Sequence, residues 1–171
     1  EVMAKSLSEK DVKSYEFTTM AYLLKNTVSE HGYVSRGECL VNDKSFLVDV
    51  TERTCIEKNG EKFVRKDDDG NVISIEGNTV VSMNFWGFTP RIYEYTGAQF
   101  ESFLEMNSEN LKAEFYIANI VSELLKSNTA TVEVLKSDAK WFGVTYKEDK
   151  ELVQEAIEEL KSQKVYPRHL W

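Results

Sequence analysis

The residues best suited to chemistry include two polar side chains in a strand-like run near the middle of the chain. Ser82 and Asn84 alternate with the apolar residues Val81, Met83 and Phe85. Because successive side chains of a strand point to opposite faces, the two polar residues are predicted to share one face. A buried amide needs hydrogen-bond partners, so Asn84 could bind a ligand hydroxyl, or it could bond neighbouring backbone and order the sheet. The run predicts a polar, sugar-like ligand, contacted by Asn84 or Ser82.

A carboxylate and a guanidinium stand side by side at Glu52 and Arg53. The carboxylate could accept hydrogen bonds from sugar hydroxyls, while the guanidinium could hold a phosphate through two parallel hydrogen bonds. The alternative is an ordinary exposed ion pair, which contributes little to stability. If the ligand hypothesis is right, we expect Glu52, Arg53 and Asn84 to line one hollow.

Gly37, Arg36 and Trp86 have less certain roles. Gly37 could let a ligand approach the backbone of a strand, or it could form a β-bulge. Arg36 could be a second anion contact, but a solvated cross-strand partner is the favoured interpretation. Trp86 could supply an apolar wall under a sugar ring, although an aromatic residue in a strand more often belongs to the core.

The elements that must position these residues divide into a β-rich first half and a helical second half. The first half is predicted to contain the end of a helix at 1–11, a buried strand at 15–24, a hairpin at 33–50 that turns near 42–43, a second hairpin that turns at 67–71, and a strand at 79–88. The second half is predicted to contain a helix at about 110–126, a short strand at 131–135 and a helix that follows a capping box at 145–148.

The ordered set of short motifs resembles a known family. Arg36-Gly37 is like the glycine-bearing strand of the sugar-1-phosphate nucleotidyltransferases, Glu52-Arg53 is like their Glu-Lys pair, and Asn84-Phe85-Trp86 is like their Asn/Gly-aromatic strand. The likeness is greatest to bacterial nucleotidyltransferases with segments similar to SEHGYVSRG, VTERT, VSMNFWGFTP and KWFGVTYKED, and it covers nearly all 171 residues. The family has Lys where Arg53 stands, and this change keeps the charge but alters the geometry.

The resemblance implies an α/β fold, with a mixed β-sheet, hairpins and packed helices, like the C-terminal part of a nucleotide-diphospho-sugar transferase. It also implies an enzyme that joins an NTP to a sugar 1-phosphate and releases pyrophosphate. The substrate-binding residues would be Gly37, Glu52, Arg53, Ser82, Asn84 and Trp86. A non-catalytic small-molecule-binding or interaction module derived from the same fold is the alternative.

The family's glycine-rich loop for nucleotide phosphates has no counterpart in this sequence. We therefore expect residues 1–171 to be one unit from the C-terminal portion of a longer enzyme, inactive alone, with the nucleotide-binding part before Glu1. An isolated piece of this kind could self-associate as a homodimer through exposed apolar surface.

The metal prediction also comes from the resemblance. Family members hold Mg²⁺ partly through an Asp or Asn near the segment that matches Trp141–Thr145, where this chain has no carboxylate, so no metal ligand is assigned here. Residues 65–76 only partly imitate a calcium loop and are predicted to be a solvated turn. His31 and His169 have no second ligand at zinc spacing.

Composition limits the possible partners and location. The net charge of −8 disfavours nucleic-acid and anionic-membrane binding, and no apolar run is long enough for a membrane span. Cys39 and Cys55 are predicted to be two buried free thiols, which suits a reducing, cytoplasmic location.

Overall fold

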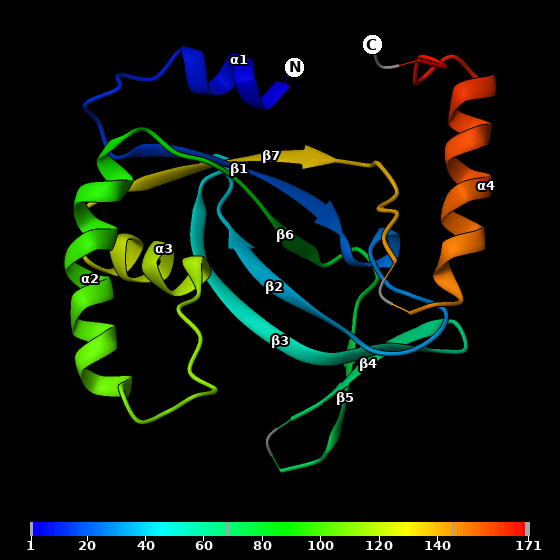
Figure 1. The fold of residues 1–171 in the computed structure, drawn as a ribbon, viewed down its shortest axis with the longest axis horizontal. Coiled ribbons are helices and arrows are strands. Elements are labelled where there is room, and N and C mark those ends of the chain that lie inside the picture. The colour runs from blue at the N-terminus through cyan, green and yellow to red at the C-terminus, as the bar shows by residue number, and fades with distance from the viewer. Residues whose placement is uncertain (1, 68, 145, 170–171) are drawn as a thin grey trace.

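A curled mixed β-sheet forms the centre of the computed structural model, which describes residues 2–67, 69–144 and 146–169 (Figure 1). Within these residues the sheet has seven strands in the order β5-β4-β3-β2-β6-β1-β7. The strands are β1 (Glu16–Leu23), β2 (Val34–Val41), β3 (Leu47–Asn59), β4 (Lys62–Lys66), β5 (Val72–Ile75), β6 (Val80–Gly87) and β7 (Thr131–Ser137). The predicted mixed α/β class is therefore confirmed, and the sheet is curled into a half-barrel.

The strand pairing explains the mixed character of the sheet. β1 runs antiparallel to β6 and parallel to β7, whereas β2, β3, β4 and β5 form successive antiparallel pairs. β2 meets β6 in only two register pairs, Gly37 with Ser82 and Glu38 with Val81. The long strand β3 pairs with β2 along its first part and with β4 along its last three residues, so it carries the curvature of the sheet.

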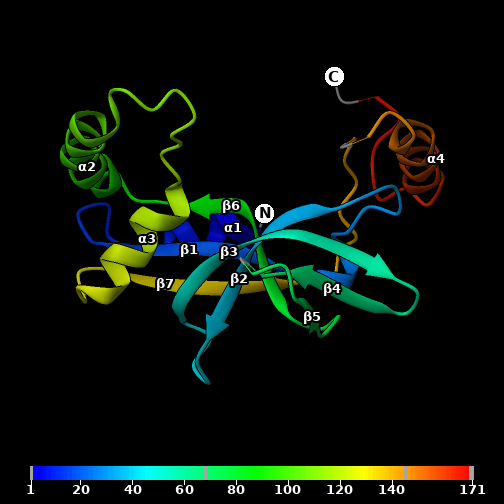
Figure 2. The same ribbon diagram turned by 90° about the horizontal axis from the view of Figure 1, so that it is seen from below.

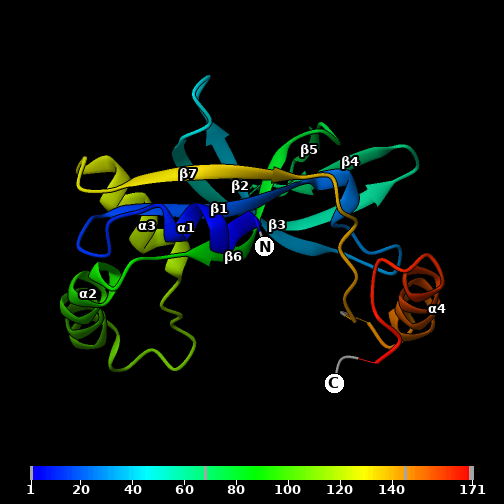
Figure 3. The same ribbon diagram turned by 90° about the horizontal axis from the view of Figure 1, so that it is seen from above.

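Four α-helices of the described chain lie around the sheet. They are α1 (Val2–Ser8), α2 (Arg91–Asn107), α3 (Ile117–Lys126) and α4 (Asp149–Ser162), with a short 3-10 helix, η1 (Leu24–Asn26), after β1. Helices α2 and α3 lie at one end of the sheet and α4 lies at the other, as the views from below and from above show (Figures 2 and 3). None of the helices among the described residues combines the length and apolar character needed to cross a membrane.

The main core lies between α3 and the sheet. Val121 and Leu124 of α3 are completely buried, and they belong to one cluster with Phe17 of β1, Val50 of β3 and Val132 of β7. The apolar residues of α3 fall on one face at helical spacing, and this pattern accounts for the packing of the helix against the sheet. A smaller cluster, made of Leu24, Val34, Ile56 and Val81, fills the region near η1.

Most predicted elements are confirmed, but the helix predicted from about residue 110 begins at Ile117. The side-chain oxygen of Asn110 accepts a hydrogen bond from the backbone N–H of Lys112, at 3.1 Å, and its carbonyl accepts from Ala113. Such local bonds compete with helix formation, so the apolar periodicity extends further than the helix does.

The chain also contains a hairpin that the hydrophobic periodicity did not predict. Gly60, with a φ of +62°, lies in the turn between β3 and β4.

Two other expectations need comment. Both cysteines are free and Cys39 is buried as predicted, but Cys55 is exposed and has a φ of +55°, so the prediction of two buried thiols is wrong. The hydroxyl of the predicted capping box belongs to Thr145, which lies outside the described residues. Near the start of α4, the carboxylate of Asp149 accepts a hydrogen bond from the backbone N–H of Tyr146 at 2.8 Å.

The contact between α3 and β3 gives a testable prediction. Ser122 donates to Asp49 at 2.6 Å, and this hydrogen bond lowers the pKa of the Asp49 carboxyl. We expect Ser122→Ala to lower the free energy of unfolding by about 1 to 2 kcal/mol at neutral pH. A carboxyl with a depressed pKa stabilises the fold above its unfolded-state pKa and loses this effect as the pH falls. Urea unfolding should therefore show a difference that shrinks in acid, and a pH-independent difference would contradict the assignment.

Candidate functional site

Four residues form a straight row across the middle of the sheet. The register pairs Ala21 of β1 with Ser82 of β6, Ser82 with Gly37 of β2, and Gly37 with Glu52 of β3. Directly paired residues of neighbouring strands place their side chains on the same face. The row therefore consists of three small residues that end at a carboxylate. Three of the predicted site residues, Gly37, Glu52 and Ser82, are brought together in this way.

Gly37 leaves space that its neighbours partly use. A Cβ atom at this position would lie 3.0 Å from Cγ2 of Val50, 3.4 Å from Cβ of Ser82 and 3.6 Å from Oε2 of Glu52. The register shifts of β2 fall elsewhere, between Val34 and Arg36 and between Leu40 and Val41, so Gly37 is in regular pairing and not in a bulge. The glycine thus permits close packing, and it lets the Glu52 carboxylate lie near the backbone of β2.

Glu52 has a perturbed carboxyl although its side chain reaches solvent. Partial removal from water raises its pKa, and the positive charge of Arg36 opposes this effect. Tyr116, immediately before α3, is a further group in electrostatic contact with Glu52, and its hydroxyl is hydrogen-bonded to Glu114. An ionised Glu52 offers only hydrogen-bond acceptors, so it suits a ligand that presents hydroxyl groups.

Asn84 does not have the buried position that the alternation of residues predicted. It is exposed and has a φ of +56°, in a register shift of β6 that lies opposite the Thr19 to Ala21 segment of β1. Its backbone N–H donates to Oγ of Ser82 at 3.1 Å. The irregular backbone breaks the strict alternation, so the buried-amide argument is wrong. Asparagine is one of the few non-glycine residues that readily adopt this conformation, and this is the only local signal for it.

Trp86 was predicted to be either an apolar wall of the ligand site or a core residue, and the structure shows it packed against the core with its N–H bonded to Asn84. Its ring is half-buried, stacks on Phe88 with centroids 6.0 Å apart, and packs against the main core. Its indole N–H donates to Oδ1 of Asn84 at 3.3 Å. The ring therefore contributes to the core, while the N–H orients the exposed amide. Because Oδ1 of Asn84 accepts this bond, the bond also sets the direction in which the Nδ2 group of Asn84 points.

Arg53 lies on the face of the sheet opposite to Glu52. Glu52 pairs with Gly37 and Arg53 pairs with Arg36, and consecutive residues in regular pairing alternate between faces. Nε of Arg53 forms an ion pair with Glu38 at 2.7 Å. The expectation that Glu52, Arg53 and Asn84 line one hollow is therefore wrong, because Arg53 and Glu52 lie on opposite faces of the sheet.

Arg36 is buried, so the interpretation of it as a solvated cross-strand partner is wrong. Its guanidinium donates to the carbonyl oxygens of Ser35 and Thr27 and lies 4.9 Å from the ring centroid of Trp141. Burial lowers the pKa of Arg36 to about 10, against the opposing field of Glu52. The position of Trp141 depends on the tertiary fold, and the strand pattern of β2 contains no signal for it.

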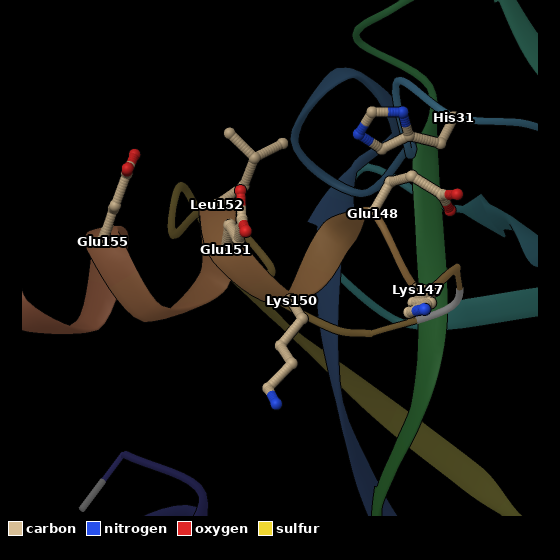
Figure 4. A pocket seen from close by; sticks show the side chains of 7 residues that line it. All are labelled: His31, Lys147, Glu148, Lys150, Glu151, Leu152 and Glu155. Carbon is tan, nitrogen blue, oxygen red and sulfur yellow. The ribbon is translucent and has the colours of Figure 1, made fainter.

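Sequence reasoning also missed a hollow beside α4. Buried Asp149 accepts a hydrogen bond from Ser29 at 3.0 Å, and Nε2 of His31 lies 3.9 Å from the same carboxylate oxygen. On one side of this contact is an open hollow of about 700 Å³ (Figure 4). Its lining residues are His31, Lys147, Glu148, Lys150, Glu151, Leu152 and Glu155. Figure 4 shows Glu151, Leu152 and Glu155 along α4, Lys147 on the segment before the helix and His31 on a separate loop. These side chains do not converge on one point, which is typical of a solvated surface.

The segment implied in Mg²⁺ binding does not fit that role with the residues described. Gly143 has no side chain, and atoms of the Trp141 ring lie 2.0 to 2.8 Å from where its Cβ would stand. The backbone N–H of Trp141 donates to the carbonyl of Asn26, so the segment is fixed against the end of β1. No group of three His, Cys, Asp or Glu residues suited to a metal ion occurs among the described residues.

The row and its surroundings favour one ligand chemistry. Neither a protein-family model nor a curated protein sequence matches the chain. The inference about ligands therefore depends on the geometry. Glu52 supplies acceptors, and the exposed Asn84 amide lies two residues beyond Ser82 on β6. A small molecule with several hydroxyl groups matches this combination.

A pair of glycine variants tests the steric part of this description. We expect Gly37→Ala to destabilise the protein by about 1 to 2 kcal/mol, because its Cβ would overlap Val50. Gly97, inside α2, is the control because nothing lies within 4 Å of its Cβ position. Gly97→Ala should stabilise the protein by about 0.5 to 1 kcal/mol through helix propensity. Urea unfolding of both variants measures this, and a neutral Gly37→Ala would refute the close packing.

Proposed function

We propose that this chain forms the sugar-phosphate side of a nucleotidyltransferase that joins an NTP to a sugar 1-phosphate. The observation that carries the proposal is the row in which Glu52, Gly37 and Ser82 occupy adjacent strands. The motif likeness predicted these residues from three separate segments of the sequence. Their meeting in one row is the arrangement that a shared ligand would require.

The row would act by positioning the sugar. The Glu52 carboxylate would accept hydrogen bonds from sugar hydroxyls, and Gly37, which packs closely against Val50 and Ser82, would let that carboxylate lie near the backbone of β2. In the reaction, a phosphate oxygen of the sugar 1-phosphate attacks the α-phosphorus of the NTP, and pyrophosphate leaves. This chemistry requires no protein nucleophile, so orientation and charge neutralisation are the contributions expected of the protein.

A non-catalytic binding module is the alternative function, and one observation favours it. The segment that would carry a metal ligand is occupied with structural contacts, because the Trp141 ring contacts Arg36 and the Trp141 backbone N–H donates to the carbonyl of Asn26. A module that kept the sugar site but not the metal site would bind sugar phosphates without turnover. The two functions therefore predict the same binding but different activity.

The decisive experiment combines binding and turnover. Isothermal titration calorimetry of residues 1–171 with a panel of sugar 1-phosphates should detect binding, and the protein as encoded should release pyrophosphate when an NTP is added. We expect Glu52→Gln to weaken binding at least tenfold, or by about 1.4 kcal/mol or more, since one acceptor oxygen becomes an NH2 donor and the other loses its charge. In turnover, the loss should appear mainly in KM for the sugar phosphate.

Glu57→Gln is the matched control, because it makes the same change on the same strand, opposite Val64 and outside the row. It should leave both binding and turnover at the wild-type level. Binding without pyrophosphate release would support the binding module. If Glu52→Gln and Glu57→Gln behave alike, the row does not bind the sugar.

A further inference from the structure

A second hollow lies between α4, the segment around η1 and the segment that follows β7. Its volume is about 340 Å³, which is within the usual range of small-molecule sites. Among the described residues it shares only Leu152 with the open hollow of Figure 4, and none of the four residues of the row lines it. Its apolar lining residues are Val28, Trp141, Phe142, Leu152, Val153 and Ala156.

The wall that carries Trp141 is fixed by contacts within the protein. The backbone N–H of Trp141 donates to the carbonyl of Asn26 at 2.9 Å, and Nδ2 of Asn26 donates to the carbonyl of Asp138 at 3.1 Å. The guanidinium of Arg36 lies 4.9 Å from the centroid of the Trp141 ring. The aromatic wall is therefore formed before a ligand binds, and this lowers the entropic cost of binding.

The opposite wall is the incompletely covered apolar side of α4. Among the described residues of the helix, Asp149 alone is buried. Val153 and Ala156 are half-buried and Leu152 is exposed, although all three line the hollow. Covering apolar surface is favourable, so a small apolar molecule placed between α4 and the aromatic wall would gain from both sides.

Lys140 supplies a positive charge at the rim of the hollow. Its Nζ atom lies 5.6 Å from the centroid of the Phe142 ring, and it takes part in no ion pair among the described residues. The other lining lysine, Lys25, donates its ammonium hydrogen bond to Oδ1 of Asn78 at 2.8 Å. Lys140 is thus the cation that remains available to a ligand.

The two acidic residues of the lining are engaged elsewhere. Glu30 forms an ion pair with Lys58 at 2.6 Å. Asp149 accepts hydrogen bonds from the Ser29 hydroxyl at 3.0 Å and from the backbone N–H of Tyr146 at 2.8 Å. These partners compensate both carboxylates, so the charge that the hollow offers to a ligand is the ammonium group of Lys140.

We propose that this hollow binds a small aromatic carboxylate. The aromatic ring of the ligand would pack between the rings of Trp141 and Phe142 and the apolar side of α4. Its carboxylate would accept a charge-assisted hydrogen bond from Lys140. The site is separate from the row that contains Glu52, so it does not depend on the proposed function.

NMR titration of the protein with 2-naphthoate and with its neutral amide, 2-naphthamide, tests both the place and the ligand class. We expect backbone amide signals of residues 141–144 and 152–156 to shift, with the carboxylate binding about fivefold more tightly than the amide. Lys140→Gln should bring the two affinities to the same value. Lys147→Gln is the matched control, because Lys147 lines the open hollow of Figure 4 instead, and it should leave the preference unchanged.

Filling the hollow tests the apolar contact. Ala156→Leu should weaken the binding of both probes by about tenfold or more, because the larger side chain would occupy the ligand's volume. Gln154→Leu introduces the same side chain at an exposed position of α4 and should leave binding unchanged. Should Ala156→Leu fail to fold, nuclear Overhauser contacts in the wild type between naphthyl protons and the methyl groups of Val153 and Ala156 decide the same point.

Four outcomes would overturn the proposal: no binding of either probe, signal shifts or Overhauser contacts confined to other parts of the protein, equal affinities for the carboxylate and the amide, or a preference that persists in Lys140→Gln. A competition keeps the test apart from the proposed function. Glucose 1-phosphate should not displace 2-naphthoate, and Glu52→Gln should leave 2-naphthoate binding unchanged. Displacement by the sugar phosphate would show that the hollow is not a separate site, and the inference would be lost. If 2-naphthoate binds as expected while no sugar 1-phosphate binds, the proposed function fails and this site stands.

Discussion

The fold depends on one short contact between β2 and β6. Two register pairs, Gly37 with Ser82 and Glu38 with Val81, join the strands β5, β4, β3 and β2 to the strands β6, β1 and β7. Little space is left at this contact, because a Cβ atom at Gly37 would lie 3.0 Å from Val50 and 3.4 Å from Ser82, and this constraint favours small residues on one side of it. The sheet is also joined at the start of β3, where Phe46 forms a bridge with Glu133 of β7. The row of the candidate site therefore occupies the position where the curled sheet is held together.

The same constraint explains why the site could be found only in part from sequence. Alternation of polar and apolar residues is a local property, and it correctly located β1, β2, β6 and β7 and both predicted hairpin turns. The pairing of Gly37 with Glu52 does not follow from the turn of the first hairpin alone, because a register shift between Leu40 and Val41 lies between that turn and Gly37. The pairing of Gly37 with Ser82 brings together two strands, β2 and β6, that are separated in the chain by three other strands, and no local pattern contains that information.

The errors have the same origin. The burial of Arg36 depends on Trp141, which is more than a hundred residues away in the sequence. The exposure of Asn84 depends on a register shift between β1 and β6, where three residues of β6 lie opposite one residue of β1, so a strict period of two does not hold there. The late start of α3 has a local cause. The side chain of Asn110 accepts a hydrogen bond from the backbone N–H of Lys112, which competes with helix formation, and asparagine is a residue that favours turns.

The charge distribution places a limit on what the row could bind by itself. A phosphorylated sugar is an anion, and the chain has a net charge of −8. The four positions of the row contain one carboxylate and no cation, while Arg36 and Arg53 project from the opposite face. The row is therefore suited to the hydroxyl groups of the sugar and not to its phosphate. For a nucleotidyltransferase, the phosphate charge would have to be neutralised by other cations or by Mg²⁺ held elsewhere. This division makes turnover by residues 1–171 alone unfavourable even if the sugar binds, because charge neutralisation is the larger part of catalysis in phosphoryl transfer.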